Sequence, residues 1–378
     1  MQYRKFGNTD IDISALGFGA MRLPQKEAGG KTVWDHEESI RIMHLAFERG
    51  VNYIDTAPYY CDKESEVIVG KALKAWKGQR IYLSTKNPIE NASGDDWRKR
   101  LEHSLKQLDR DSVDFYHMWG ISLEAFTNCI DVPNGPIEAA LKAKQEGLVK
   151  HLSFSFHDKP ENMIPIIDSE YFETLLCQYN LLDRANEAAI AHANKKGLGV
   201  VVMGPVGGGR LGFPSEAIAS LLPGKVSSSP AIALRFVLSN PGVCCALSGM
   251  GSEKMVLENC ETASNEAALS NEELETLNRA TEENRKLEGL YCTGCNYCMP
   301  CPAGVNIPLV FQQMNYKRIW KLDEYARDQY AQIGKVDWMK GKDASACVDC
   351  GICETKCPQK LEIRKQLKES HAALARNQ

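Results

Sequence analysis

The chain has 378 residues and a formal net charge of −4, with 45 Lys and Arg against 49 Asp and Glu. This length allows two domains and a core that needs no disulfide staples, which excludes a small cysteine scaffold. Acidic and basic residues are interspersed, so the charge indicates neither a nucleic-acid partner nor an anionic membrane surface.

The first residues are polar, and the sequence contains no run of about eighteen or more apolar residues, so we predict neither a secretion signal nor a membrane span. We therefore expect a soluble, cytoplasmic protein. In a reducing compartment the 14 cysteines are better interpreted as metal ligands and buried thiols than as disulfides.

Seven short apolar segments have the length and composition of β-strands. Longer segments of helical spacing separate them, such as residues 36–50 and 95–108. This alternation predicts an α/β fold of parallel strands, and a short eighth strand near 261–266 would close a (β/α)8 TIM barrel. The open doubly wound sheet is the alternative, but the glycine-rich stretch 204–212 lies far from the first strand–helix turn, where a dinucleotide fingerprint belongs. The seven strand segments are 51–55, 81–86, 113–119, 149–156, 174–180, 199–204 and 242–249.

The predicted strands end in polar and aromatic residues, at the edge of a barrel where active sites lie. The first ends in DTAPYY and the second in STK, which brings Asp55, Tyr60 and Lys86 to one end. A buried Asp–Lys pair is also compatible with a structural ion pair. With a tyrosine beside them, these groups indicate acid chemistry, because a nearby ammonium lowers the pKa of a phenol from about 10. Asp55 would hold Lys86 charged and in place.

Eight cysteines form two clusters near the C-terminal end. In the second, CVDCGICETKCP, the spacing of two, two and three residues before a proline is the ferredoxin pattern for a [4Fe–4S] cluster. The first, CTGCNYCMPCP, is one residue shorter, with only Met299 and Pro300 between its last two cysteines. The predicted ligands are Cys292, Cys295, Cys298 and Cys301 in the first motif and Cys347, Cys350, Cys353 and Cys357 in the second.

Three cysteines at this spacing wrap a loop around one cube, and the fourth ligand comes from elsewhere. In two-cluster ferredoxins the cysteine before the proline binds the other cluster, so we expect Cys357 to complete the first cluster and Cys301 the second. Two structural zinc sites are the alternative, although zinc has no need of a third cysteine at fixed spacing. Helical spacing over 307–334 predicts a mainly α-helical dicluster domain over 286–378, after a barrel over 1–285.

The first part of the chain resembles the aldo-keto reductases. Its segments YRKFGNTDIDISALGFGAMRLP, DTAPYY, STK, HLSFSFH, QYNLLDR and LSGMGSEKMVLENC occur in the order of that family, and the tail resembles its iron–sulfur branch. The resemblance implies a (β/α)8 barrel that binds a nicotinamide cofactor without a Rossmann domain. It also implies carbonyl reduction by a tetrad of Asp, Tyr, Lys and His, whose first three members match Asp55, Tyr60 and Lys86.

The fourth member of this tetrad has no direct match. The family's histidine lies five residues after the Asp of the third strand, and this chain has Trp119 there. His117 lies two residues earlier and faces the same side of a strand. It is therefore either the functional histidine, one layer deeper, or a core residue.

The resemblance also assigns contacts to the cofactor. Ser155 and Gln178 match residues that hold the nicotinamide amide, and Met203 lies where an aromatic ring often stacks on it. Contacts on the adenosine side are assigned to Ser252, Asn259 and Gly249. The last position is basic in many NADPH-dependent members, and a ribose phosphate is best held by Arg or Lys. These residues leave three possibilities open: NADH, NADPH, or no nicotinamide cofactor. They do not exclude a flavin.

These features suggest three functions. The first is an oxidoreductase acting on a small organic substrate in the barrel, with Tyr60 as proton donor and two [4Fe–4S] clusters that exchange electrons with a ferredoxin-like partner. A hydride carrier moves two electrons together and a cube moves one, which is why their combination suggests a partner. The alternatives are an NAD(P)H-dependent carbonyl reductase with structural clusters, and an electron carrier or partner-binding protein with an inactive barrel.

Overall fold

The computed structural model describes residues 1–212, 218, 228–265, 269–289, 292, 296–357 and 360–376. The chain divides into two compact units, the first formed by 1–207 and 233–269 and the second by 208–232 and 270–378. The expected domain boundary at 285 stays a prediction. In the described ranges no helix has both the length and the apolar composition to cross a membrane.

The first unit contains a closed barrel of eight parallel strands, in which each strand pairs with the next and β12 pairs with β3. The seven predicted strands are confirmed. The expected eighth strand is wrong, because residues 261–265 belong to helix α10, and Glu266 lies outside the described residues. The eighth strand is β3, whose sequence LGFG lacks the β-branched pattern of a strand. The barrel strands are β3 (Leu16–Gly19), β6 (Tyr53–Asp55), β7 (Tyr82–Pro88), β8 (Val113–Ile121), β9 (Val149–Phe156), β10 (Thr174–Gln178), β11 (Gly199–Met203) and β12 (Cys245–Ser248).

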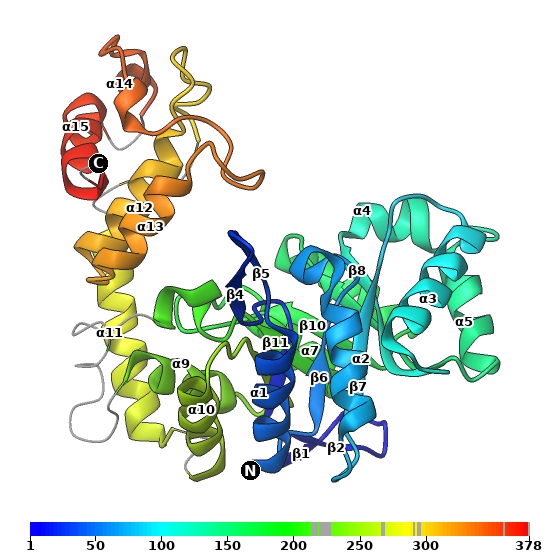
Figure 1. Ribbon diagram of the computed structural model, residues 1–378. Helices are drawn as coiled ribbons and strands as arrows, with labels where there is room; N and C mark the ends of the chain where they lie inside the picture. Colours follow the sequence, from blue (N-terminus) through cyan, green and yellow to red (C-terminus); the bar gives the residue numbers. More distant parts are fainter. Residues whose placement is uncertain are drawn as a thin grey trace. The chain divides into compact units, whose positions relative to one another are not determined.

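Helices follow the strands and lie outside the barrel (Figure 1). Their starts carry the expected caps: Asp35 accepts a hydrogen bond from Glu38 N, and Ser93 accepts one from Asp96 N. Two antiparallel hairpins stand apart from the barrel sheet, β1 (Tyr3–Lys5) with β2 (Asp12–Ser14) and β4 (Gln25–Ala28) with β5 (Lys31–Trp34). The helices are α1 (His36–Glu48), α2 (Ser65–Ala75), α3 (Gly94–Leu108), α4 (Leu123–Ala125), α5 (Pro136–Gln145), α6 (Met163–Asp168), α7 (Glu187–Lys195), α9 (Ser229–Leu238) and α10 (Glu253–Asn265).

The barrel interior is built from layers of inward-facing side chains. Phe6, which follows β1, closes the bottom and packs on Phe115 with ring centroids 4.9 Å apart. The lower layer contains Tyr53, Phe115, Leu176, Val201 and Cys245. Because side chains alternate along a strand, the residues two positions further on form the next layer towards the C-terminal ends. These residues are Asp55, His117, Gln178, Met203 and Leu247.

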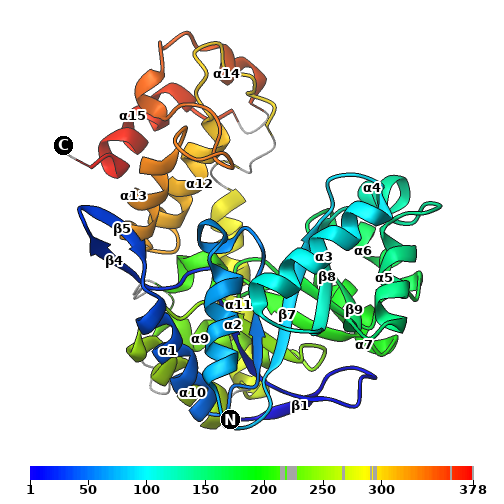
Figure 2. The same cartoon turned by 45° about the vertical axis from the view of Figure 1, so that its right-hand side comes forward.

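The second unit is mainly helical, as the spacing over 307–334 predicted. Helix α12 packs against both α13 and α15, and α14 packs against α15. Figure 2 shows α12 and α13 side by side. The helices are α11 (Asn271–Gly289), α12 (Ile307–Arg318), α13 (Asp323–Gln332), α14 (Ile352–Lys356) and α15 (Ile363–Leu374).

Candidate active site and cluster ligands

A buried ion pair lies at the C-terminal end of the barrel. Lys86 Nζ donates hydrogen bonds to Asp55 Oδ1 and, at 2.8 Å, to the backbone oxygen of Thr56. Only 2% of each charged side chain is exposed. Burial by itself would lower the pKa of Lys86, but Asp55 and Tyr60 together raise it. Burial raises the pKa of Asp55, although Lys86 acts in the opposite direction. The pair therefore keeps a charged ammonium inside the barrel.

Tyr60 lies over this ammonium, with Lys86 Nζ 4.8 Å from the centroid of its ring. The chain leaves Tyr60 through Cys61, Asp62 and Lys63, which have φ values of 51°, 51° and 76°. Three successive non-glycine residues in the left-handed region store backbone strain, which is typical of functional sites. This strain is consistent with a turn that holds the Tyr60 hydroxyl at one place.

The expected fall in the Tyr60 pKa is wrong. Burial raises the pKa of Tyr60, and the Lys86 charge offsets that effect only in part. The sequence reveals the nearby ammonium but not the desolvation of the phenolate, which is the larger effect. A raised pKa keeps Tyr60 a neutral phenol at neutral pH, so its proton remains available for transfer.

His117 is buried below the site and is bonded to the ion pair. The Ser84 hydroxyl lies 2.8 Å from both Asp55 Oδ2 and His117 Nε2. Since Ser84 has one proton and donates it to Asp55, His117 Nε2–H donates to Ser84. Burial, followed by the Lys86 charge, lowers the pKa of His117 to about 3. His117 is therefore neutral, and its Nε2 proton is committed to a chain that ends at Asp55.

Trp119 borders the phenol where the family's histidine was expected. Its ring packs edge-on against Tyr60, with centroids 5.7 Å apart and an interplanar angle of 90°. It also lies 5.5 Å from the ring of Tyr59. An indole therefore occupies the space beside the proton donor.

The positions expected to contact nicotinamide lie on neighbouring strands at the same end of the barrel. Ser155 Oγ accepts a hydrogen bond from Gly120 N at 2.7 Å. Gln178 and Met203 are paired in register at the ends of β10 and β11. The Gln178 amide lies so close to Gly204 that an added Cβ would meet Nε2 at 2.7 Å. The fold thus brings these three residues to one edge.

The adenosine-side positions lie after β12. Asn259 Nδ2 donates to Ser248 Oγ at 3.1 Å, and Ser252 Oγ accepts from Met255 N at 3.4 Å. Gly249 follows β12 directly, and an added Cβ there would lie 3.7 Å from Arg22 Cβ. Sequence reasoning missed Arg22, because it follows β3, the strand that the sequence pattern did not reveal. Arg22 is exposed and lies beside this loop, in which Gly249 occupies a position that is basic in many NADPH-dependent members of the family.

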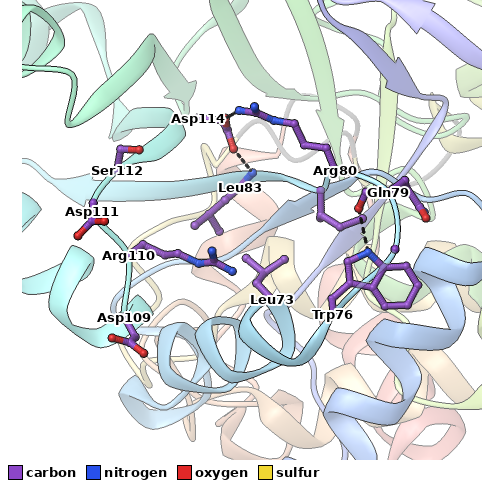
Figure 3. A pocket seen from close by; sticks show the side chains of 12 residues that line it. Leu73, Trp76, Gln79, Arg80, Leu83, Asp109, Arg110, Asp111, Ser112 and Asp114 are labelled. Atoms are coloured by element: carbon purple, nitrogen blue, oxygen red, sulfur yellow. Dashed lines mark hydrogen bonds and ion pairs between the residues drawn. The ribbon is translucent and has the colours of Figure 1, made fainter.

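A groove at the opposite end of the barrel is separate from these residues (Figure 3). It is formed by the segments that precede β7 and β8. Arg80 pairs with Asp114 at 2.6 Å, and Asp114 also accepts a hydrogen bond from Leu83 N at 2.9 Å. In (β/α)8 barrels residues at the N-terminal face mostly serve stability, and this ion pair joins the segment before β7 to β8 there.

In the second unit, cysteines from both motifs line one pocket. Cys301 of the first motif faces this pocket with Cys347, Cys350 and Cys353 of the second. Among the described residues no three Cys, His, Asp or Glu side chains converge closely enough to hold a metal ion. A single zinc ion would need sulfurs about 2.3 Å from one point, whereas a cube binds each thiolate through a different iron. The four thiols around this pocket are candidate cluster ligands, and Cys295 lies outside the described residues.

Two sequence families match the two parts of the chain. The model of the aldo/keto reductase family matches residues 15–282, and that of a 4Fe-4S dicluster domain matches residues 291–362. The chain belongs to the aldo/keto reductase family. It is an oxidoreductase with a C-terminal 4Fe-4S dicluster domain.

Curated relatives and solved structures agree with this assignment. The chain is 26% identical to the uncharacterized oxidoreductase YqkF of Bacillus subtilis, over 75% of this chain and 98% of the relative. It is 28% identical to L-galactose dehydrogenase of Arabidopsis thaliana, over 68% of this chain and 87% of the relative. The aldo-keto reductase AKR11C1 from Bacillus halodurans superposes with a TM-score of 0.63 at 27% identity, over 74% of this chain and 96% of that structure.

Proposed function

We propose that this aldo/keto reductase family member reduces a small organic carbonyl compound in the barrel, with Tyr60 as the proton donor. We further propose that its tail holds two [4Fe–4S] clusters, which exchange electrons with a ferredoxin-like partner in the cytoplasm. The observation that supports the barrel chemistry is the buried Asp55–Lys86 pair beneath the ring of Tyr60. A structural ion pair alone would not need a phenol over its ammonium.

The proton comes from this chain's own residues. A nicotinamide, when bound, supplies the hydride that forms the new C–H bond. Tyr60 gives its hydroxyl proton to the carbonyl oxygen, so the product is an alcohol. The phenolate left behind is stabilised by the Lys86 ammonium, which Asp55 holds in place, until solvent returns a proton. The raised pKa of Tyr60 keeps the donor protonated between turnovers.

Three residues would hold the nicotinamide. Ser155 and Gln178 offer a hydroxyl and an amide at one edge, which match the donor and acceptor of a carboxamide. The Gln178 amide makes no hydrogen bond to any described residue, so its donors and acceptor are available. Met203 is paired beside it and would cover one face of the ring. Ser252, Asn259, Gly249 and Arg22 border the loop expected to receive the adenosine end.

The cluster assignment rests on the pocket shared by both motifs. Cys301 with Cys347, Cys350 and Cys353 would form one set, and Cys357 would complete the set of Cys292, Cys295 and Cys298. Each cube carries one electron, so two cubes together match the electron pair that one nicotinamide hydride carries. Eight cysteines that serve as cluster ligands and not as disulfides fit a reducing compartment, which supports a cytoplasmic location.

The test of the barrel chemistry is Tyr60→Phe, which removes the donor and leaves the ring. Turnover of an active carbonyl substrate should fall roughly 100-fold or more, with little change in nucleotide binding. Tyr171→Phe is the matched control, since the Tyr171 hydroxyl bonds the exposed Asp131 at 3.2 Å, away from the site. Equal turnover in wild type and Tyr60→Phe would contradict the assignment. Failure of wild type on every carbonyl compound would favour the carrier with an inactive barrel.

A further inference from the structure

His157 lies at the mouth of the barrel, immediately after β9. Its backbone N donates to the oxygen of Ile121 at 3.2 Å, so the residue is anchored to the end of β8. It is exposed, and its imidazole makes no hydrogen bond to any of the residues that the structure describes. A histidine with two available ring nitrogens at the open end of a barrel has no structural task that these contacts explain.

β9 ends at Phe156, and continuing its alternation by one residue points His157 inwards. His151 faces the interior, where its ring stacks on Phe115 with centroids 5.1 Å apart. Residues two apart face the same side, and Ser155 follows this rule because its hydroxyl bonds Gly120 across the β8–β9 pair. Continuing the series by two positions brings His157 to the layer above Ser155.

An irregularity in β8 places His157 beside Trp119 and Gly120. Met118 pairs with Phe154 and Ile121 pairs with Phe156, so β8 has one extra residue between these pairs. Gly120, with φ 63°, turns the strand there, and an added Cβ would lie 3.5 Å from His157 Cδ2. The imidazole therefore lies over the glycine that follows Trp119.

The two other candidates for the missing histidine are accounted for. His117 uses its Nε2 proton to bond Ser84 below the site, and Trp119 packs edge-on against Tyr60. Neither presents an imidazole to a substrate above the phenol. Although part of its surface is exposed, partial burial of the ring, followed by the charge of Lys86, lowers the pKa of His157, so the imidazole is neutral at pH 7.

We propose that His157 is the imidazole that binds the carbonyl oxygen of the substrate beside the Tyr60 hydroxyl. It rests on the proposed reductase function and adds a catalytic residue to it. A neutral imidazole donates one N–H and can place the oxygen that gains negative charge as the hydride arrives, while Tyr60 supplies the proton. In this chain the imidazole would come from the end of β9, whereas in the family pattern it comes from the strand that corresponds to β8.

The kinetic test uses two substitutions at His157. His157→Phe keeps an aromatic ring over Gly120 and removes the donor, so kcat should fall roughly 100-fold, the usual scale for one such donor. His157→Gln restores an N–H donor that does not titrate, and kcat should recover to within about tenfold of wild type. His192→Phe is the matched control, because His192 bonds Asp168 at 2.8 Å on an exposed helix. A His157→Phe protein with wild-type kcat would overturn the proposal.

A second readout needs no turnover. In the complete protein labelled with ¹⁵N-histidine, the probe is benzoate, whose carboxylate imitates the charged oxygen, and His157→Gln identifies the resonance. Benzoate should shift the His157 ring signal saturably and leave His192 unmoved. An unmoved His157 signal overturns the proposal whether or not the protein reduces carbonyls. A shifted His157 in a protein whose turnover ignores Tyr60→Phe would preserve the oxygen-binding role and refute the proposed proton donor.

Discussion

The two units of this chain carry their functional residues in different ways. In the second unit, three of the four thiols around the pocket come from the seven consecutive residues Cys347–Cys353. In the barrel, Asp55, Lys86 and His117 are each about thirty residues apart and meet only because three neighbouring strands end together. Most ligands of the cluster site are therefore close together in the sequence, whereas the residues of the barrel site are brought together by the pairing register of the strands. The cluster site needs particular residues as ligands, and the barrel site needs the correct stacking of side-chain layers inside the barrel.

The largest effect is expected in the cluster unit. Each full chain should bind about eight irons, and Cys301→Ser or Cys350→Ser alone should each remove about four. Crossed ligation predicts that Cys301→Ser with Cys350→Ser also removes about four, because both thiols serve one cube. Iron and acid-labile sulfide per chain are measured on protein purified without oxygen.

The paired variants separate this arrangement from the simpler one. If each motif held its own cluster with its own four cysteines, the double variant would lose all of the iron. Cys129→Ser is the control, since this half-buried thiol lies in the barrel unit. Stoichiometric zinc without sulfide in the wild-type protein would contradict both arrangements.

The buried ion pair gives the next largest effect. Asp55→Asn leaves the Lys86 ammonium buried without its partner, and the free energy of unfolding should fall by about 3 kcal/mol or more. Adding Lys86→Met removes that stranded charge and should recover much of the loss. Urea unfolding of the three proteins measures both changes.

Activity then decides between structure and chemistry for this pair. The double variant should be stable and inactive, because Tyr60 lacks the ammonium that stabilises its phenolate. A stable double variant with wild-type turnover would show that the pair is structural only. The polar residues of the barrel would then stabilise the fold, unlike the cysteines of the second unit, which would bind the clusters.

The smallest effect is a pH dependence of stability. His117 is held neutral in the folded protein, with its pKa lowered from 6.5 to about 3. Between these values the unfolded chain binds more protons, so stability rises with pH and is lost as pH falls from about 6.5 towards 3. From pH 7 to pH 5 this histidine should account for a loss of about 2 kcal/mol.

The matched variant for this effect is His117→Gln, which retains a hydrogen bond donor to Ser84 and does not titrate. Its free energy of unfolding should fall less than that of wild type between pH 7 and pH 5, as measured by urea unfolding at each pH. Parallel losses in the two proteins would mean that folding does not lower the pKa of His117.

Much of the barrel could be predicted because seven of its strands have apolar runs between helical segments. The eighth, β3, could not, because the sequence LGFG has two glycines and no β-branched residue. A glycine there has a packing reason: a Cβ at Gly17 would come within 2.9 Å of the Cys245 sulfur. Missing this strand also hid Arg22, which follows it and lies beside Gly249.

The site was predicted in composition more than in electrostatics. The strand ends revealed Asp55, Tyr60 and Lys86, since polar residues after buried strands are visible in the sequence. The sign of the Tyr60 pKa shift was not visible, because it depends on how much water the fold removes. The role of His157 depends on the extra residue in β8, and no local pattern reports which residue of a neighbouring strand such an irregularity will bring close.

The most direct test of the whole account asks whether the two units share electrons. Protein prepared without oxygen, with its clusters and any organic cofactor it carries, is mixed with NADH, and the visible absorbance of the clusters is followed. If the two units share electrons, the cluster absorbance should bleach, because one NADH releases a proton and reduces two cubes by one electron each. Clusters that stay oxidised while the same sample reduces a carbonyl compound would contradict the account and would make the clusters structural.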